Sequence, residues 1–170
     1  MIIGFSGKAG SGKSTAANFL ANEHWFIKHK MAKPLKNMCR ALGMSEEQIE
    51  GNLKEVPDPM LDGKTPRYVM QSLGTEWGRK LIGESLWTDA WLATRPENSD
   101  IVVDDIRFLN ELTTVRSLGG KIIKIVRNLE ETESEHESEN ALHDASFDDI
   151  IINDGTIAHL QLNVYRSVFG

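Results

Sequence analysis

The chain has 170 residues, of which 40% are hydrophobic and 26% are charged, and its net charge is −6 at pH 7. This composition predicts one soluble globular domain, and the acidic balance argues against binding to a nucleic-acid polymer, which requires a basic surface. The single cysteine, Cys39, excludes an internal disulfide, and no apolar run approaches the roughly 20 residues that a membrane helix needs. The start of the sequence lacks a signal-peptide pattern, so we expect a cytoplasmic protein with no membrane partner.

Five short apolar segments are expected to form β-strands. Four of them are almost continuous in Ile, Val or Phe, which is typical of strands covered on both faces. Helical segments at Thr15–Glu23 and Asn110–Leu118, the second ended by Gly119-Gly120, alternate with them and predict βαβ units and a parallel sheet. The expected strands are Met1–Ser6, Phe26–Met31, Ile101–Asp104, Lys121–Arg127 and Asp149–Asn153.

A long insertion separates the second and third expected strands. It spans about seventy residues, far more than one crossover requires. We expect it to contain a polar loop around Val56–Gly63 and three helices, namely Pro34–Leu42, one that begins at Thr65-Pro66 with Thr as N-cap, and Leu86–Thr94. Trp77, Trp87 and Trp91 also lie here, and a small satellite core is favoured over ring stacking on a ligand.

A phosphate-binding motif follows the first expected strand. Residues 7–14 read Gly-Lys-Ala-Gly-Ser-Gly-Lys-Ser and match G-x-x-x-x-G-K-[ST]. The glycines let the backbone wrap so that its N–H groups point at phosphate oxygens, and the next helix adds its positive end. In this arrangement Lys13 reaches the β- and γ-phosphates and the Ser14 hydroxyl ligates Mg²⁺. The candidate ATP-binding residues are Gly7, Ala9, Gly10, Ser11, Gly12, Lys13, Ser14 and Thr15.

Asp104-Asp105-Ile106-Arg107 stands at the carboxyl end of the third expected strand, where ligands of open α/β sheets bind. A carboxylate there can hold a metal ion directly or through water, and an arginine fork can bind a phosphate. The alternative is a surface helix cap.

On the insertion, Arg67 and Gln71 share one face of an expected helix, and Arg79 lies further on. Arg67 and Gln71 could hold a monophosphate and the edge of a base. A solvated helix face explains their spacing equally well.

Residues 130–139 are rich in glutamate and include His136. A solvated segment is one interpretation, and a lid over the triphosphate, covering about residues 128–147, is the other. We do not expect His136 to act as a base, because phosphoryl transfer requires little proton chemistry.

Several segments together resemble the deoxynucleoside monophosphate kinases of bacteriophages, within the wider group of P-loop kinases. They span nearly the whole chain in order, and the Thr-Pro-Arg and Asp-x-Arg-Phe segments are more specific than the P-loop. These segments are Ile3–Gly7, Ala32–Lys36, Thr65–Arg67, Gln71–Glu76, Asp105–Glu111, His136–Glu139 and Ile152–Thr156.

The resemblance implies a P-loop kinase fold, a three-layer α/β/α structure with a five-stranded parallel sheet, in one domain over residues 1–170. It implies that residues 32–100 form a helical region that binds the acceptor. It also implies transfer of the γ-phosphoryl group from ATP to a deoxynucleoside monophosphate with Mg²⁺, in the host cytoplasm if the gene is viral.

The resemblance further assigns roles to residues of this chain. Lys13 and Ser14 would bind the triphosphate and metal, and Asp105 would be the second metal ligand. The candidate catalytic residues are Lys13, Asp105, Arg107 and Arg127, and the candidate acceptor-binding residues are Lys33, Arg67, Gln71, Trp77 and Arg107. The acidic lid segment carries no arginine, so either Arg107 or Arg127 would stabilise the transferred phosphoryl group.

Other functions stay open on the sequence. A kinase of another small molecule, such as dephospho-coenzyme A or phosphomevalonate, would share the fold. A P-loop NTPase switch would need a protein partner, and a non-catalytic module would only bind ATP. The apolar C-terminal residues Val164, Tyr165, Val168 and Phe169 are expected to dock on the chain's own core, with a homodimer as the alternative.

Overall fold

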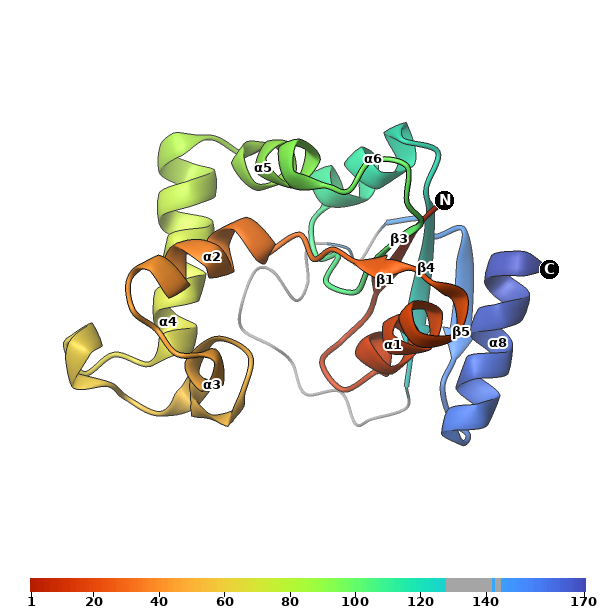
Figure 1. The fold of residues 1–170 in the computed structure, drawn as a ribbon, viewed down its shortest axis with the longest axis horizontal. Helices are drawn as coiled ribbons and strands as arrows, with labels where there is room; N and C mark the ends of the chain where they lie inside the picture. Colours follow the sequence, from red (N-terminus) through yellow and green to blue (C-terminus); the bar gives the residue numbers. More distant parts are fainter. Residues whose placement is uncertain (128–141, 143–144) are drawn as a thin grey trace. The chain divides into compact units, whose positions relative to one another are not determined.

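The computed structural model describes residues 1–127, 142 and 145–170. Their contacts form two compact units, and each unit is described by itself (Figure 1). The sheet unit comprises Met1–Lys30 and Arg95–Gly170, and the helical unit comprises Met31–Thr94. The helical unit occupies the long insertion that the spacing of the strands predicts.

A five-stranded parallel sheet forms the centre of the sheet unit, in the order β2-β3-β1-β4-β5. The first strand therefore lies in the middle, and the phosphate-binding motif follows a strand with neighbours on both sides. All five strands predicted from the sequence are present. Their bounds are β1 Ile2–Ser6, β2 Ile27–Lys28, β3 Ile101–Val103, β4 Lys121–Val126 and β5 Asp149–Ile152.

Helices cover both faces of this sheet. On one face α1 (Lys13–His24) packs beside α8 (Ile157–Phe169), and the shared core includes Ile3, Phe5 and Leu20. On the other face α6 (Leu109–Ser117) packs on β1 and β4. Gly4 points to this second side, where a Cβ atom would lie 2.7 Å from Cδ1 of Ile122. Neighbours in β1 thus face opposite layers, as strand geometry requires, and the three-layer α/β/α architecture is confirmed.

The two edge strands differ from the prediction. β2 is much shorter than the predicted Phe26–Met31, and it pairs with β3 through Ile27 and Lys28. β5 is not covered on both faces: Ile150 and Ile152 are 55% and 48% exposed. Helix α8 is absent from the predicted elements, but its Val164 and Val168 pack on the chain's own core as expected.

The helical unit surrounds a small core of its own. Leu35, Cys39, Met44, Ile49 and Trp87 form it, which confirms the expected satellite core for Trp87. Thr65 caps α4 as predicted, because its Oγ1 accepts a hydrogen bond of 3.2 Å from the backbone N–H of Tyr68. The elements are α2 Lys33–Ala41, α3 Glu46–Ile49, two 3₁₀ turns at Asn52–Glu55 and Pro59–Leu61, α4 Pro66–Gln71, a π-helix at Ser72–Ile82 and α5 Leu86–Thr94.

Candidate nucleotide-binding site

The loop between β1 and α1 adopts backbone angles that require glycine. Gly7, Gly10 and Gly12 have φ of 142°, 74° and 109°, in the left-handed region that side chains disfavour. A Cβ on Gly7 would lie 2.2 Å from the carbonyl oxygen of Ile125 in β4. The glycines of the motif therefore serve both the curvature of the loop and its close packing on the sheet.

Lys13 stands at the first residue of α1, where the loop ends. Its ammonium donates hydrogen bonds of 2.6 Å to the carbonyl oxygens of Gly7 and Lys8. The side chain is thus held at the loop by the loop's own carbonyl groups. A cation in this place, with the N-terminus of a twelve-residue helix, makes a local site for an anion in an acidic chain.

A pocket of about 410 Å³ extends from this loop to the beginning of α8. It brings Arg127, which follows β4, to the same cavity as Lys13, Ser14 and Thr15. Arg127 is exposed. The remaining lining residues are Gly10, Gly12, Asn153, Gly155, Ile157 and Leu160.

Asn153 links the last strand to the loop and is not among the site residues selected from the sequence. Its backbone N–H continues the β4–β5 pairing with a bond of 2.7 Å to Val126 O. Its buried side-chain amide donates a hydrogen bond of 2.8 Å to the carbonyl oxygen of Ser11. In the sequence Asn153 is an asparagine at the end of an apolar segment. Asparagine is common in turns, so this position alone does not indicate a contact with the P-loop.

The two carboxylates after β3 differ in their surroundings. Asp104 is buried, and the ammonium of Lys28 lies 3.3 Å from its Oδ2. Within the described residues, neither carboxylate oxygen of Asp104 accepts a hydrogen bond of normal geometry. Asp105 is half-buried. A buried charge without hydrogen bonds is costly, so Asp104 is the residue of this pair that needs a structural or chemical explanation.

A short chain of contacts places Asp104 toward α1. Lys28 donates a hydrogen bond of 2.7 Å to Oδ1 of Asn18, a residue of α1. Ser14 lies four residues before Asn18, so both lie on one face of this helix. The Ser14 hydroxyl and the Asp104 carboxylate therefore belong to the same side of the sheet.

Glu111 fixes the backbone at the start of α6. This buried carboxylate accepts hydrogen bonds from the backbone N–H groups of Arg107 and Phe108, at 2.8 and 3.1 Å. The Asp-x-Arg-Phe-x-Asn-Glu segment is thus a self-capped turn into a helix. Arg107, a candidate for phosphate contact, is half-buried at this turn.

The acceptor-binding candidates lie in the helical unit. Arg67 is exposed and forms an ion pair with Glu55, and Gln71 is the half-buried last residue of α4. Trp77 is 37% exposed, with its ring centroid 6.3 Å from that of Trp87. Lys33 is exposed at the first residue of α2.

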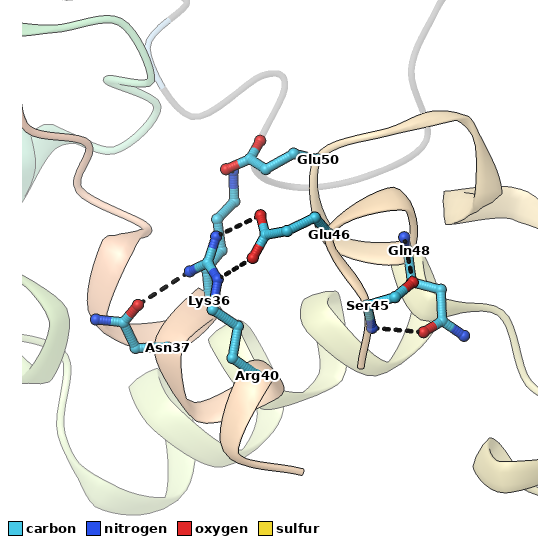
Figure 2. A network of polar contacts seen from close by, with 7 residues as sticks. All are labelled: Lys36, Asn37, Arg40, Ser45, Glu46, Gln48 and Glu50. Atoms are coloured by element: carbon cyan, nitrogen blue, oxygen red, sulfur yellow. Dashed lines mark hydrogen bonds and ion pairs between the residues drawn. The ribbon is translucent and has the colours of Figure 1, made fainter. Parts of the chain in front are cut away.

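Two other cations of the helical unit, Lys36 and Arg40, bind carboxylates of α3 and its end (Figure 2). Arg40 donates to both oxygens of Glu46, at 2.5 and 2.9 Å, and Lys36 lies 2.7 Å from Glu50. The hydrogen bond from Arg40 is the main reason why the pKa of Glu46 is lowered. This network joins α2 to the chain around α3.

Cys39 is the residue before Arg40 on α2, and it is fully buried. Burial raises the pKa of its thiol, and the nearby charges of Arg40 and Lys36 oppose that effect only in part. A buried thiol with a raised pKa is a poor nucleophile, so Cys39 is a core residue.

Some predictions concern residues that the structure does not describe. The lid predicted at about 128–147 and His136 lie largely or wholly outside the described residues. Over the described ranges, no group of three or more His, Cys, Asp or Glu residues is arranged to hold a metal ion. No helix in the described part is both long and apolar enough to span a bilayer.

Comparison with solved structures agrees with this architecture. The Thermus thermophilus protein TT1252 superposes with a TM-score of 0.54 at 19% identity, covering 100% of this chain and 98% of that one. Dephospho-CoA kinase from Campylobacter jejuni gives a TM-score of 0.51 at 18% identity, covering 98% and 94%. At these identities the likeness establishes the fold, and this chain has the α/β fold of P-loop kinases.

Comparison of sequences is more specific. A protein of Acanthamoeba polyphaga mimivirus, provisionally named deoxynucleotide monophosphate kinase, is 35% identical over 99% of this chain and 96% of its own length. The deoxynucleotide monophosphate kinase of Escherichia phage RB69 is 30% identical over 67% of this chain, which spans 49% of that protein. The family model described as deoxynucleotide monophosphate kinase matches residues 62–164, more than half of the chain. With the P-loop pocket in place, the chain belongs to the deoxynucleotide monophosphate kinase family of enzymes.

Proposed function

We propose that this protein transfers the γ-phosphoryl group of ATP to a deoxynucleoside 5′-monophosphate, giving ADP and a deoxynucleoside diphosphate. The observation that carries the proposal is the P-loop pocket that contains Lys13 and Arg127, in a chain of this family. An oxygen of the acceptor phosphate attacks the γ-phosphorus as the bond to the β,γ-bridging oxygen breaks. Catalysis of such a transfer rests on positioning and on neutralising charge.

ATP is assigned to the sheet unit. The backbone N–H groups of residues 7–14 and the N-terminus of α1 would hold the phosphates, and Lys13 would leave the carbonyl groups of Gly7 and Lys8 to bind the β- and γ-phosphates. Arg127 lines the same pocket and would contact the triphosphate. Arg107, on the turn fixed by Glu111, would approach the transferred group or the acceptor phosphate.

The residues present fit Mg²⁺, which prefers oxygen ligands. Ser14 supplies a hydroxyl, and Asp104 supplies a buried carboxylate whose oxygens lack hydrogen bonds within the described residues. We assign the metal to Ser14 and Asp104, whereas the sequence suggested Asp105. The contacts of Lys28 with Asn18 of α1 and with Asp104 support this choice. When bound, the ion neutralises charge on the β- and γ-phosphates.

The acceptor is assigned to the helical unit. Arg67 and Gln71 lie one helical turn apart on α4, and the Arg67 guanidinium already holds one carboxylate, that of Glu55. A guanidinium fork that binds a carboxylate can bind a phosphate in the same way. Trp77 and Lys33 are the further candidates for contact with the nucleotide.

The test is a coupled assay of ADP production from ATP and Mg²⁺, with a panel of nucleoside and deoxynucleoside monophosphates, dephospho-coenzyme A and a control without acceptor. We expect deoxynucleoside monophosphates to raise the rate by orders of magnitude. Lys13→Ala should lower kcat about 10²–10³-fold with the fold intact, since it removes an electrostatic contact to the transferred group. Arg67→Ala should raise KM for the acceptor about 10–100-fold and leave KM for ATP unchanged.

Lys80→Ala is the matched control, because Lys80 is an exposed cation that pairs with Glu76 one turn away. Its kinetics should match the unmodified protein. Wild-type turnover in folded Lys13→Ala, or stimulation by dephospho-coenzyme A alone, would reject the proposed function.

A further inference from the structure

The P-loop depends on a side chain that lies far from it in the sequence. Nδ2 of Asn153 donates a hydrogen bond of 2.8 Å to the carbonyl oxygen of Ser11, 142 residues earlier. This contact is buried, and Asn153 itself is 8% exposed. This hydrogen bond connects the residue after β5 to the middle of the phosphate-binding loop.

The same amide packs against the glycine before the catalytic lysine. A Cβ atom on Gly12 would lie 2.5 Å from Nδ2 of Asn153, and Gly12 already has a φ of 109°. The side chain of Asn153 therefore fills the space next to Gly12 and holds the residue that precedes it. Asn153 therefore contacts two consecutive residues of the loop: it forms a hydrogen bond with Ser11 and packs against Gly12.

Asn153 is itself held firmly. Its backbone N–H bonds to Val126 O at 2.7 Å, so its position follows from the β4–β5 ladder. The same ladder ends beside Arg127, and Asn153, Arg127 and Gly12 line one pocket. Because the amide donates to the Ser11 carbonyl, it restrains the orientation of the Ser11–Gly12 peptide, and the N–H group of a trans peptide points opposite to its carbonyl group.

We propose that Asn153 is a positioning residue for ATP: it orients the Ser11–Gly12 peptide so that the loop N–H groups are directed at the phosphates before ATP arrives. The proposal rests on the assignment of ATP to the P-loop. A loop oriented in advance loses less conformational entropy when it binds ATP. The Asn153–Ser11 hydrogen bond should therefore contribute to ATP affinity more than to the chemical step.

The experiment compares Asn153→Asp and Asn153→Ala with the unmodified protein. The Asp side chain keeps the size of Asn but replaces the donor by an acceptor that repels both the Ser11 carbonyl and phosphate. Calorimetric titration with ATP and Mg²⁺, without acceptor, should show a dissociation constant raised about tenfold or more in both variants, with the larger change in Asn153→Asp. In steady-state assays KM for ATP should rise likewise, while KM for the deoxynucleoside monophosphate stays within about twofold.

Asn163→Ala is the matched control. Asn163 lies on α8, and its amide lies 3.4 Å from the ring of His159, away from the P-loop pocket. ATP affinity should be unchanged in this variant. Thermal unfolding without nucleotide, measured for all variants, separates loss of binding from loss of fold.

Two results would overturn the proposal. One is an unchanged dissociation constant for ATP in folded Asn153→Asp and Asn153→Ala. The other is a parallel rise of both KM values that follows the loss of thermal stability, which would make Asn153 only a structural residue. If the unmodified protein binds ATP but phosphorylates no acceptor, the proposed function fails while the titration still decides the role of Asn153.

Discussion

Asp104 and Asp105 are adjacent in the sequence, yet they lie in different surroundings. Asp104 is buried beside Lys28, and Asp105 is half-buried. Strand β3 ends at Val103, so the two carboxylates lie on the bend that follows it and not within the sheet. The resemblance favoured Asp105, and the Asn18–Lys28–Asp104 contacts favour its neighbour.

Because their surroundings differ, we expect removal of the charge of Asp104 and of Asp105 to change the response to Mg²⁺ differently. Asp104→Asn keeps the shape and removes the charge, so the Mg²⁺ concentration for half-maximal rate should rise about 10–100-fold, the range found when a metal site loses a supporting group. Asp105→Asn should change it by less than about threefold. Initial rates measured over a Mg²⁺ series at fixed ATP, with thermal unfolding of both variants, provide the check. The reverse order of the two effects would return the metal to Asp105.

At the scale of elements, the packing of the π-helix at Ser72–Ile82 has a clear physical basis. The Trp87 indole donates a hydrogen bond of 2.8 Å to Gly74 O and lies against Gly78. A Cβ on Gly78 would approach the indole atoms to 2.5–2.7 Å. The absence of a side chain at Gly78 thus lets a large side chain of α5 lie directly on the backbone of the neighbouring helix, within the core of the helical unit.

Gly78→Ala tests this packing. Alanine gains up to about 1 kcal/mol in helix propensity, but the overlap with a ring held by its own hydrogen bond should cost about 1–3 kcal/mol and dominate. Urea unfolding followed by tryptophan fluorescence should therefore show a lower midpoint. Gly83→Ala is the control, because Gly83 has an extended φ of 167° and a Cβ added there would have no described atom within 4 Å. Equal midpoints for the two variants would contradict the packing argument.

At the scale of the whole molecule, the proposed function distributes its two substrates over two units. The P-loop, Arg127 and Asn153 belong to the sheet unit, and Arg67, Gln71 and Trp77 belong to the helical unit. Each unit has its own hydrophobic core. Each substrate alone should therefore stabilise mainly the unit that binds it.

Hydrogen exchange followed by mass spectrometry can detect which unit each substrate stabilises. ATP with Mg²⁺ should slow exchange in residues 7–20 and 153–160, by up to about 100-fold at 100 times its dissociation constant. A deoxynucleoside monophosphate alone should slow exchange within residues 52–82. The Lys13→Ala variant should lose the first effect and keep the second. Protection by the monophosphate at the P-loop alone would place the acceptor in the sheet unit and contradict the assignment.

The class of the protein, the parallel sheet and the P-loop could be predicted from the sequence, because these depend on local patterns. Continuous apolar runs, a glycine-rich turn after the first strand and the Thr65 cap act over a few residues, and each is present where it was predicted. Helix α8 and the short β2 were not predicted correctly, since their bounds depend on which strands and helices they pair with. Only the tertiary structure brought Asn153 to Ser11 and Lys28 to Asp104, because such contacts join residues whose separation along the chain carries no periodic signal.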